Sequence, residues 1–154
     1  MFTYGTLKPG EINHRLCAGQ VLEAVRSYTW GELFTLPLGY PAMIPGNSRV
    51  EGFLLVFPDP SILTVLDELE DYQPNRPPQE NEYYRQKRAI YTPAGEPLGT
   101  AWAYLMAWEM VQQLGGVLLP SGWWTGKRHR RGESSKAAGQ GSGESAPRRG
   151  GKAE

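Results

Sequence analysis

The sequence predicts a mixed α+β fold, in which several short strands curl around a core and a helix covers one side. Glycine (19 residues) and proline (13 residues) are frequent, and the apolar runs between them are short, as is typical of strands. One segment, after Pro60, has the periodicity of an amphipathic helix. A length of 154 residues with 40% hydrophobic residues is enough for one domain with a core.

The first half of the chain predicts a strand that enters Tyr4, a short helix at residues 14–22, and strands at residues 26–34 and 50–57. The last of these contains Glu51-Gly-Phe-Leu-Leu-Val-Phe57, with Pro45-Gly46-Asn47 before it and Pro58 after it. Because residues of these types mark turns, we expect a buried strand that is bounded on both sides.

The clearest helix begins at Asp59-Pro60, where Asp can cap the first turn and Pro suits the first helical position. It continues to Glu70, and Pro74 has to end it. At 100° per residue, one apolar stripe is expected to face the core. The stripe consists of Ile62, Val65, Leu66 and Leu69. Glu70 falls on its edge, whereas Glu68 and Asp71 point the other way.

The second half predicts strands at residues 83–91 and 99–108, and a helical turn at residues 108–114. Residues 101–108 alternate small with large side chains, as a strand does when one face packs on a core. Trp123 and Trp124 are expected to close this core. The domain therefore spans residues 1–126, and residues 127–154 form a tail.

The net charge of zero hides an asymmetry between these two parts. Residues 1–126 carry 8 Lys and Arg against 13 Asp and Glu, whereas residues 127–154 carry 8 against 3. From Gly132 onward the tail has no large apolar residue, so we expect it to be disordered. Its basic cluster, residues 127–131, could touch nucleic acid, but it lacks interleaved aromatic residues and is better explained as a solvated tail.

Cys17 is the only cysteine, so an internal disulfide is excluded and a reducing, cytoplasmic location is expected. No apolar stretch approaches the roughly 20 residues that span a bilayer, and no basic and apolar leader begins the sequence, so neither export nor a membrane partner is expected. The carboxylates of residues 67, 68, 70 and 71 radiate to different faces of one helix and cannot converge on a metal ion.

Three short motifs follow one another along the chain: Tyr4-Gly5-Thr6-Leu7-Lys8-x-Gly10, Leu66-Asp67-x-x-Glu70-x-Tyr72 and Tyr83-x-Arg85. Together they resemble the γ-glutamylcyclotransferase-like (AIG2-like) family, and its γ-glutamylamine cyclotransferase branch more than its glutathione-degrading branch. The segment Gly39-Tyr40-Pro41-Ala42 is similar to a pocket-lining segment of the family, and Ser121-Gly122-Trp123-Trp124 to the close of its domain. The resemblance spans residues 2–124.

The resemblance implies a small mixed β-barrel with flanking helices, and intramolecular aminolysis of a γ-glutamyl amine or amide without a cofactor. In this reaction the α-amine of the substrate attacks its own γ-carbonyl and closes a five-membered lactam, which gives 5-oxoproline and a free amine. Because the substrate carries the nucleophile, the protein has to fold the substrate, move protons and stabilise an oxyanion. The family pattern places the single catalytic acid–base residue at Glu70.

A carboxylate in this role should titrate near the working pH rather than at about 4.3. Contact of Glu70 with Leu63 and Leu66 would raise its pKa by desolvation. A glutamate at this angle of a helix can instead reach solvent, and the motif favours the functional interpretation.

By resemblance, Tyr4 and the backbone N–H groups of Gly5, Thr6 and Leu7 bind the glutamyl moiety, since glycine leaves a loop open to a ligand. These groups could meet either the α-carboxylate or the developing oxyanion. Tyr83 is expected to line the pocket, although an aromatic residue on a strand can equally belong to the core.

Two alternatives stay open at this point. Arg85 could pair with a carboxylate or form an exposed ion pair. The whole chain could also be a non-catalytic module that binds a small molecule on the same fold.

Overall fold

The computed structural model describes residues 1–126 apart from residues 71, 74 and 77–80. Its main element is an antiparallel sheet with the strand order β1-β3-β2-β4-β5, in which β6 pairs with β2. The strands are β1 (Phe2–Thr3), β2 (Glu23–Thr35), β3 (Pro41–Val56), β4 (Tyr84–Tyr91), β5 (Pro97–Leu105) and β6 (Val117–Leu118). The prediction of a mixed α+β fold is therefore confirmed. The predicted disordered tail lies outside the described residues.

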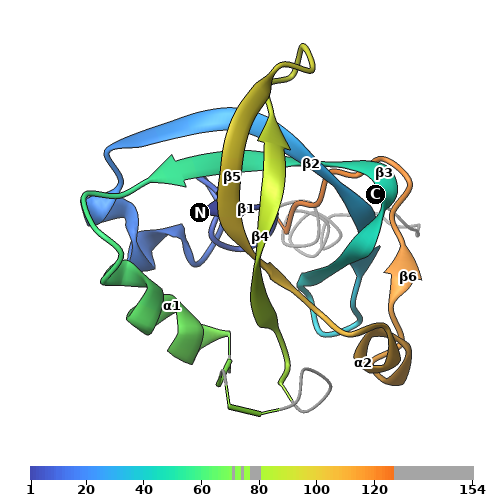
Figure 1. The fold of residues 1–154 in the computed structure, drawn as a ribbon. Coiled ribbons are helices and arrows are strands. Elements are labelled where there is room, and N and C mark those ends of the chain that lie inside the picture. The colour runs from blue at the N-terminus through green and yellow to red at the C-terminus, as the bar shows by residue number, and fades with distance from the viewer. Residues whose placement is uncertain (71, 74, 77–80, 127–154) are drawn as a thin grey trace, which may run out of the picture.

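The sheet is strongly curled, so that β1 and β5, at the two ends of the strand order, contact each other. Figure 1 shows β4 and β5 crossing over the long β2–β3 hairpin, with α1 (Ile62–Leu69) beside one end of the curl and α2 (Trp108–Gln113) beside the other. The curled sheet corresponds to the small mixed β-barrel that the resemblance implies. Within the described residues, no helix is long and apolar enough to cross a membrane.

β3 is twice as long as the predicted strand, because Pro45-Gly46-Asn47 is not a turn that precedes it. The register pairs Gly31 with Ser48 and then Glu32 with Ile44, so residues 45–47 bulge out of a continuous strand. Turn residues and bulge residues are of the same types, and only the partner strand distinguishes the two. The correction matters, because the start of β3 reaches the functional site described below.

α1 differs from the predicted helix at its beginning and in its buried face. Its N-cap is Ser61 rather than Asp59, and Asp59, two positions further out, accepts a hydrogen bond at Oδ1 from the Ser61 backbone N–H (2.8 Å). Ile62 and Leu66 are buried, but Val65 and Leu69 of the predicted stripe are 49% and 38% exposed. Only two of the four predicted stripe residues are therefore buried, so the apolar face that this short helix packs on the core is smaller than predicted.

The remaining elements depart from prediction by a few residues. The predicted helix at residues 14–22 is two 3-10 turns, η1 (His14–Leu16) and η2 (Ala18–Gln20). β5 ends at Leu105 rather than at residue 108, because α2 begins at Trp108, and β6 was not predicted.

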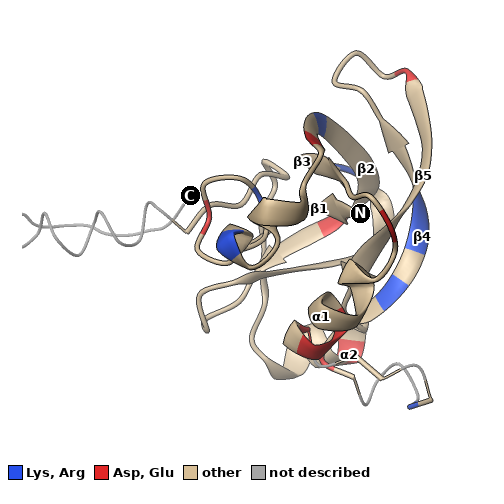
Figure 2. Cartoon of the chain, turned by 90° about the vertical axis from the view of Figure 1, so that its left-hand side faces the viewer, with Lys and Arg blue, Asp and Glu red and all other residues tan. Residues whose placement is uncertain are grey.

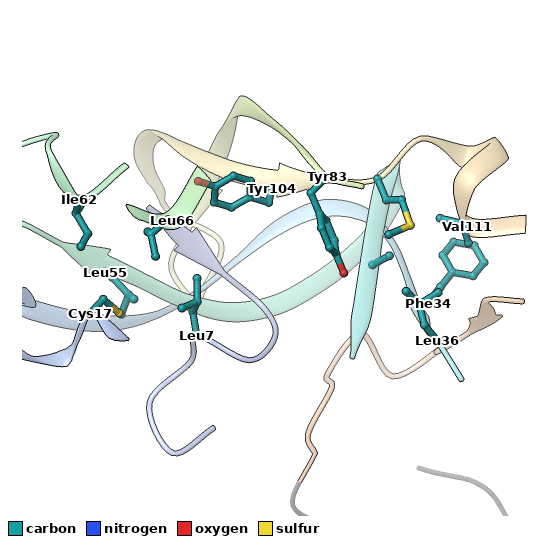
Figure 3. Close-up of a cluster of buried hydrophobic side chains, with 12 residues drawn as sticks. Leu7, Cys17, Phe34, Leu36, Leu55, Ile62, Leu66, Tyr83, Tyr104 and Val111 are labelled. Carbon is teal, nitrogen blue, oxygen red and sulfur yellow. The ribbon is translucent and has the colours of Figure 1, made fainter. Parts of the chain in front are cut away.

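One part of the core joins α1 to the loop that follows β1. Figure 3 shows Leu7, Cys17 and Leu55 gathered beneath Ile62 and Leu66, with Tyr104 and Tyr83 further along the same cluster. A completely buried leucine contributes on the order of 2 kcal/mol by burial, so this contact fixes α1 against the loop.

The last described residues are tied to the same loop. Lys8 donates from Nζ to the carbonyl of Trp124, and its ammonium lies 3.7 Å from the centre of the Trp123 ring. Glu11 accepts a hydrogen bond from Thr125 Oγ1 (2.8 Å). Trp124 is buried, as predicted, so the end of the domain closes over its beginning.

Candidate active site

The loop at residues 4–7 leaves β1 and is held by the segment that follows it. Three of its carbonyl groups accept hydrogen bonds from that segment. The bonds run from Lys8 N–H to Gly5 O (3.1 Å), from Asn13 N–H to Thr6 O (2.9 Å), and from His14 Nδ1 to Leu7 O (2.8 Å). Because a carbonyl only accepts, Nδ1 of His14 carries the proton. The loop is therefore fixed through its acceptors.

The backbone N–H groups of Gly5, Thr6 and Leu7 make no hydrogen bond within the described part of the chain. All three residues line a cavity of about 240 Å³. Adjacent N–H groups that face a concave surface form a site for an anion or for a developing negative charge. The predicted binding residues thus share one surface.

Gly5 has a second reason to be glycine, which is its contact with the start of β3. A Cβ on Gly5 would lie 2.8 Å from Cγ of Pro41, closer than side-chain carbons approach each other. The bulge in β3 allows this strand to extend back to Pro41, beside the loop. Loop and strand together form one wall of the cavity.

Glu70 ends α1 and lines the same cavity. Its N–H donates to the carbonyl of Leu66 (3.0 Å), which places the residue at the C-terminus of the helix. The side chain is partly buried. Burial, with a smaller contribution from repulsion by Glu82, raises the pKa of Glu70 to about 7. The carboxyl group can therefore both accept and donate a proton near neutral pH.

The other residues around the cavity come from the N-terminus, the start of β3 and the ends of β4 and β5. Its lining consists of residues 1–7, Asn13, Tyr40, Pro41, Leu69, Glu70, Glu82, Tyr83 and Tyr104. Ligand pockets usually measure about 300–1,000 Å³. At about 240 Å³ this cavity lies just below that range, so it suits a small ligand.

Tyr4 and Tyr83 line the cavity, but their hydroxyl groups are engaged in the protein. Tyr4 donates to the carbonyl of Tyr104 (2.7 Å) and accepts from Met43 N–H (3.2 Å). Tyr83 donates to the carbonyl of Pro41 (2.6 Å). Burial raises the pKa of both hydroxyls above its ordinary value, so both stay protonated. In this structure their hydroxyls hold the walls together, and their rings face the ligand space.

The sequence analysis did not identify Glu82. It lies directly before Tyr83, and its Oε2 accepts a hydrogen bond from Tyr40 (2.5 Å). Tyr40 belongs to the segment that resembles a pocket-lining one, but no local pattern connects it to residue 82.

A carboxylate–cation pair fixes α1 to the sheet. Arg85 donates to both carboxylate oxygens of Asp67 (2.7 and 3.1 Å), and Tyr104 donates to Oδ1 (2.5 Å). Arg85 and Asp67 are each 17% exposed. In Figure 2, α1 carries acidic residues (red) and β4 carries basic residues (blue); the pair joins one residue of each element. Of the two sequence alternatives for Arg85, pairing with a carboxylate is the one observed, and the pair is largely buried.

In the part of the chain that the structure describes, nothing indicates that the other carboxylates on and next to α1 form a shared metal site. Glu68 is exposed, and Asp71 lies outside the described residues. Among the residues that the structure describes, no three His, Cys, Asp or Glu side chains are placed to share a metal ion.

A model of one protein family, described as γ-glutamyl cyclotransferase, AIG2-like, matches residues 1–126. The chain belongs to this family. The match covers the whole described domain and agrees with the resemblance carried by the three motifs. No curated protein matches the sequence.

Solved structures support the AIG2-like fold. YkqA from Bacillus subtilis is 24% identical with a TM-score of 0.59, over 88% of this chain and 42% of YkqA. The uncharacterized protein PH0828 from Pyrococcus horikoshii is 16% identical with a TM-score of 0.59, over 86% and 95% of the two chains. The E. coli protein c4763, specific to uropathogenic strains, is 17% identical with a TM-score of 0.53, over 84% and 91%. At these identities the likeness shows the fold, and the chain spans less than half of YkqA.

In this AIG2-like chain, Asp67 is one helical turn before Glu70, so its pairing should position the carboxyl group of Glu70. We expect Asp67→Asn to lower the free energy of unfolding by about 1–2 kcal/mol, because a largely buried guanidinium loses its charged partner. Denaturant unfolding measures this effect. Glu68→Gln removes an exposed carboxylate one residue away and should leave stability unchanged; equal effects of the two substitutions would contradict the prediction.

Proposed function

We propose that the protein is a cyclotransferase that cleaves a γ-glutamyl amine or amide into 5-oxoproline and a free amine. A bond forms between the substrate's α-nitrogen and its γ-carbon, and the amide bond from that carbon to the leaving amine breaks. Glu70 passes two protons in turn from the α-nitrogen to the leaving nitrogen: the first when the α-ammonium group becomes a nucleophilic amine, the second after that nitrogen has attacked the γ-carbon. The lactam nitrogen then keeps one hydrogen, and the amine leaves as an ammonium ion. The reaction needs no further nucleophile or co-reactant.

The N–H groups of Gly5, Thr6 and Leu7 are the proposed counterpart of Glu70. During ring closure the γ-carbonyl oxygen becomes negative, and N–H donors that are fixed in advance stabilise such a charge. The same donors could instead bind the α-carboxylate. In either case the loop holds the glutamyl moiety in a bent conformation. This conformation places the α-nitrogen next to the γ-carbon of the same molecule, so the two reacting atoms are oriented before the reaction begins.

One observation carries this proposal: Glu70, with its half-buried carboxyl group, and three residues whose N–H groups are unused in the described part of the chain line the same small cavity. A proton-transfer group and an anion-binding group are the two parts that intramolecular aminolysis requires. Family membership supports the same reaction type. Isolated carboxylates on surfaces do not combine these features.

The test is to incubate the protein with a panel of γ-glutamyl amines and γ-glutamyl amino acids and to measure 5-oxoproline and the released amine. Both products should appear in equal amounts with at least one substrate. If ligands bind but no member of the panel yields 5-oxoproline, the non-catalytic binding module is the better interpretation.

The pH dependence of turnover follows from the pKa of Glu70. The unprotonated carboxylate is the base, so kcat/KM should rise with pH and reach half of its limit near pH 7. An ordinary glutamate would place that midpoint near pH 4.3. Buried Tyr4, Tyr83 and Tyr104 do not titrate in this range, because burial raises the pKa of each. A kcat/KM profile with its midpoint below about pH 5 would contradict this role for Glu70.

A further inference from the structure

The cavity holds a second carboxylate, Glu82, which is held in place by Tyr40. The Tyr40 hydroxyl donates to Oε2 of Glu82 at 2.5 Å, and the Tyr40 ring lies 6.3 Å from that of Tyr83. Pro41, which follows Tyr40, is anchored by the hydroxyl of Tyr83. Glu82 is therefore oriented by Tyr40, which directly precedes β3, and it is partly exposed to the cavity.

Only one of the two Glu82 carboxylate oxygens is used. Within the described part of the chain, Oε1 accepts no hydrogen bond and Glu82 forms no ion pair. A carboxylate offers about four lone-pair sites, and a single tyrosine satisfies one of them. An unused acceptor that faces a cavity suits a cationic donor on a ligand.

The charged side chains described in the lining of the cavity are all acidic. Among its described lining residues the charged side chains are Glu70 and Glu82, and neither Lys nor Arg is present. The amino group of Met1 also lies at the cavity, where it donates to the carbonyl of Leu55 (3.1 Å). Repulsion between the two carboxylates contributes to the raised pKa of Glu70. A cation placed between them would relieve this repulsion.

We propose that Glu82, oriented by Tyr40, is a specificity-determining residue that binds the α-ammonium group of the γ-glutamyl substrate beside Glu70. This inference rests on the function proposed above. The ammonium group has three N–H donors, so it can donate to Glu82 while a second proton passes to Glu70. The arrangement would hold the nitrogen in place after it becomes a neutral amine. The γ-carbonyl would then point to the N–H groups of the loop.

The electrostatics of this arrangement favour the proton transfer. Tyr4, Tyr40, Tyr83 and Tyr104 surround the two carboxylates and stay protonated, because burial raises the pKa of each. A bound ammonium would therefore add a positive charge beside Glu70 that no described side chain of the cavity lining supplies. It would favour the ionised form of Glu70 as the substrate arrives, which prepares the base only when an amine is present.

Binding to a protein without turnover tests the inference. In a Glu70→Gln background, γ-glutamyl methylamide is compared with glutaric acid monomethylamide, which lacks the α-ammonium group, by titration calorimetry. Adding Glu82→Gln should weaken binding of the first ligand about 10- to 100-fold, as loss of a hydrogen bond between charged groups does. Binding of the second ligand should not change.

Two further variants separate the role of Glu82 from general effects. Glu68→Gln removes the same charge from an exposed position of α1 and should leave both affinities unchanged. Tyr40→Phe keeps the Glu82 carboxylate but frees it to move, and should weaken only the ammonium-bearing ligand, by less than Glu82→Gln. Thermal unfolding of each variant checks the fold.

Each remaining outcome has a definite meaning. If Glu82→Gln weakens both ligands equally, or neither, the inference is wrong while the proposed function stands. If neither ligand binds to the Glu70→Gln protein, the proposed function fails and the inference fails with it.

Discussion

Replacing Glu70 with glutamine is expected to lower kcat by about 10²- to 10⁴-fold, the range that general acid–base catalysis contributes. Glutamine keeps the shape of the side chain but can neither accept the proton of an ammonium group nor return it to the leaving amine. The loop N–H groups are untouched by the change, so the substrate should still bind. Initial rates of 5-oxoproline release, measured at saturating substrate, give the effect directly.

The stability of the same variant provides the control, because the pKa of Glu70 fixes the direction in which its free energy of unfolding changes. Burial raises the pKa of Glu70 from 4.5 in the unfolded chain to about 7 in the folded one. Between these values the folded state binds more protons, so this contribution to stability is complete below pH 4.5 and is lost as the pH rises to about 7. Glutamine does not ionise. At pH 8 the variant should therefore be at least as stable as the parent protein.

Loss of turnover together with unchanged or improved stability would assign the defect to chemistry rather than to folding. Glu68→Gln, on the exposed face of α1, is the matched control for the charge and should retain full activity. If Glu70→Gln retains more than about a tenth of the parent kcat, another group moves the proton and the proposed role of Glu70 fails.

The position of Glu70 could be predicted from sequence because its determinants are local. The angle between Leu66 and Glu70 follows from helix geometry, and the C-terminus of α1 lies within a few residues of Pro74. The loop at residues 4–7 was predictable for a similar reason, since the donors to its three bonded carbonyl groups, those of Gly5, Thr6 and Leu7, lie within seven residues. The catalytic role of Glu70 and the binding role of the loop stay proposals.

Glu82 and the start of β3 could not be predicted because their determinants are distant. The partner of Glu82, Tyr40, is 42 residues away, and nothing in the neighbouring sequence shows that the two meet. Pro45-Gly46-Asn47 has the composition of a turn, and only pairing with β2 makes it a bulge. Asp67 was seen as one of several carboxylates on a helix, and its pairing with Arg85 depends on how α1 packs on β4.

Gly52→Ala is expected to have a large effect on stability, because the space at this position is filled by backbone. A Cβ on Gly52 would lie 2.1 Å from the carbonyl oxygen of Thr3 in β1, and 3.0 Å from Cζ of Phe2. A side chain could rotate away, but the backbone of Thr3 can move only if β1 leaves β3. We expect the free energy of unfolding to fall by about 3 kcal/mol, at the upper end of the usual cost of overpacking.

Turnover should fall as well, since the loop at residues 4–7 continues directly from β1. Displacement of Thr3 moves Tyr4 and Gly5, and a shift of about 1 Å in a positioning group can cost on the order of 100-fold in rate. Urea unfolding and rates of 5-oxoproline release measure the two effects. Gly19→Ala is the matched control, because a Cβ there has no atom within 4 Å. If Gly52→Ala proves as stable and as active as Gly19→Ala, β1 does not hold the loop in the way that the cavity requires.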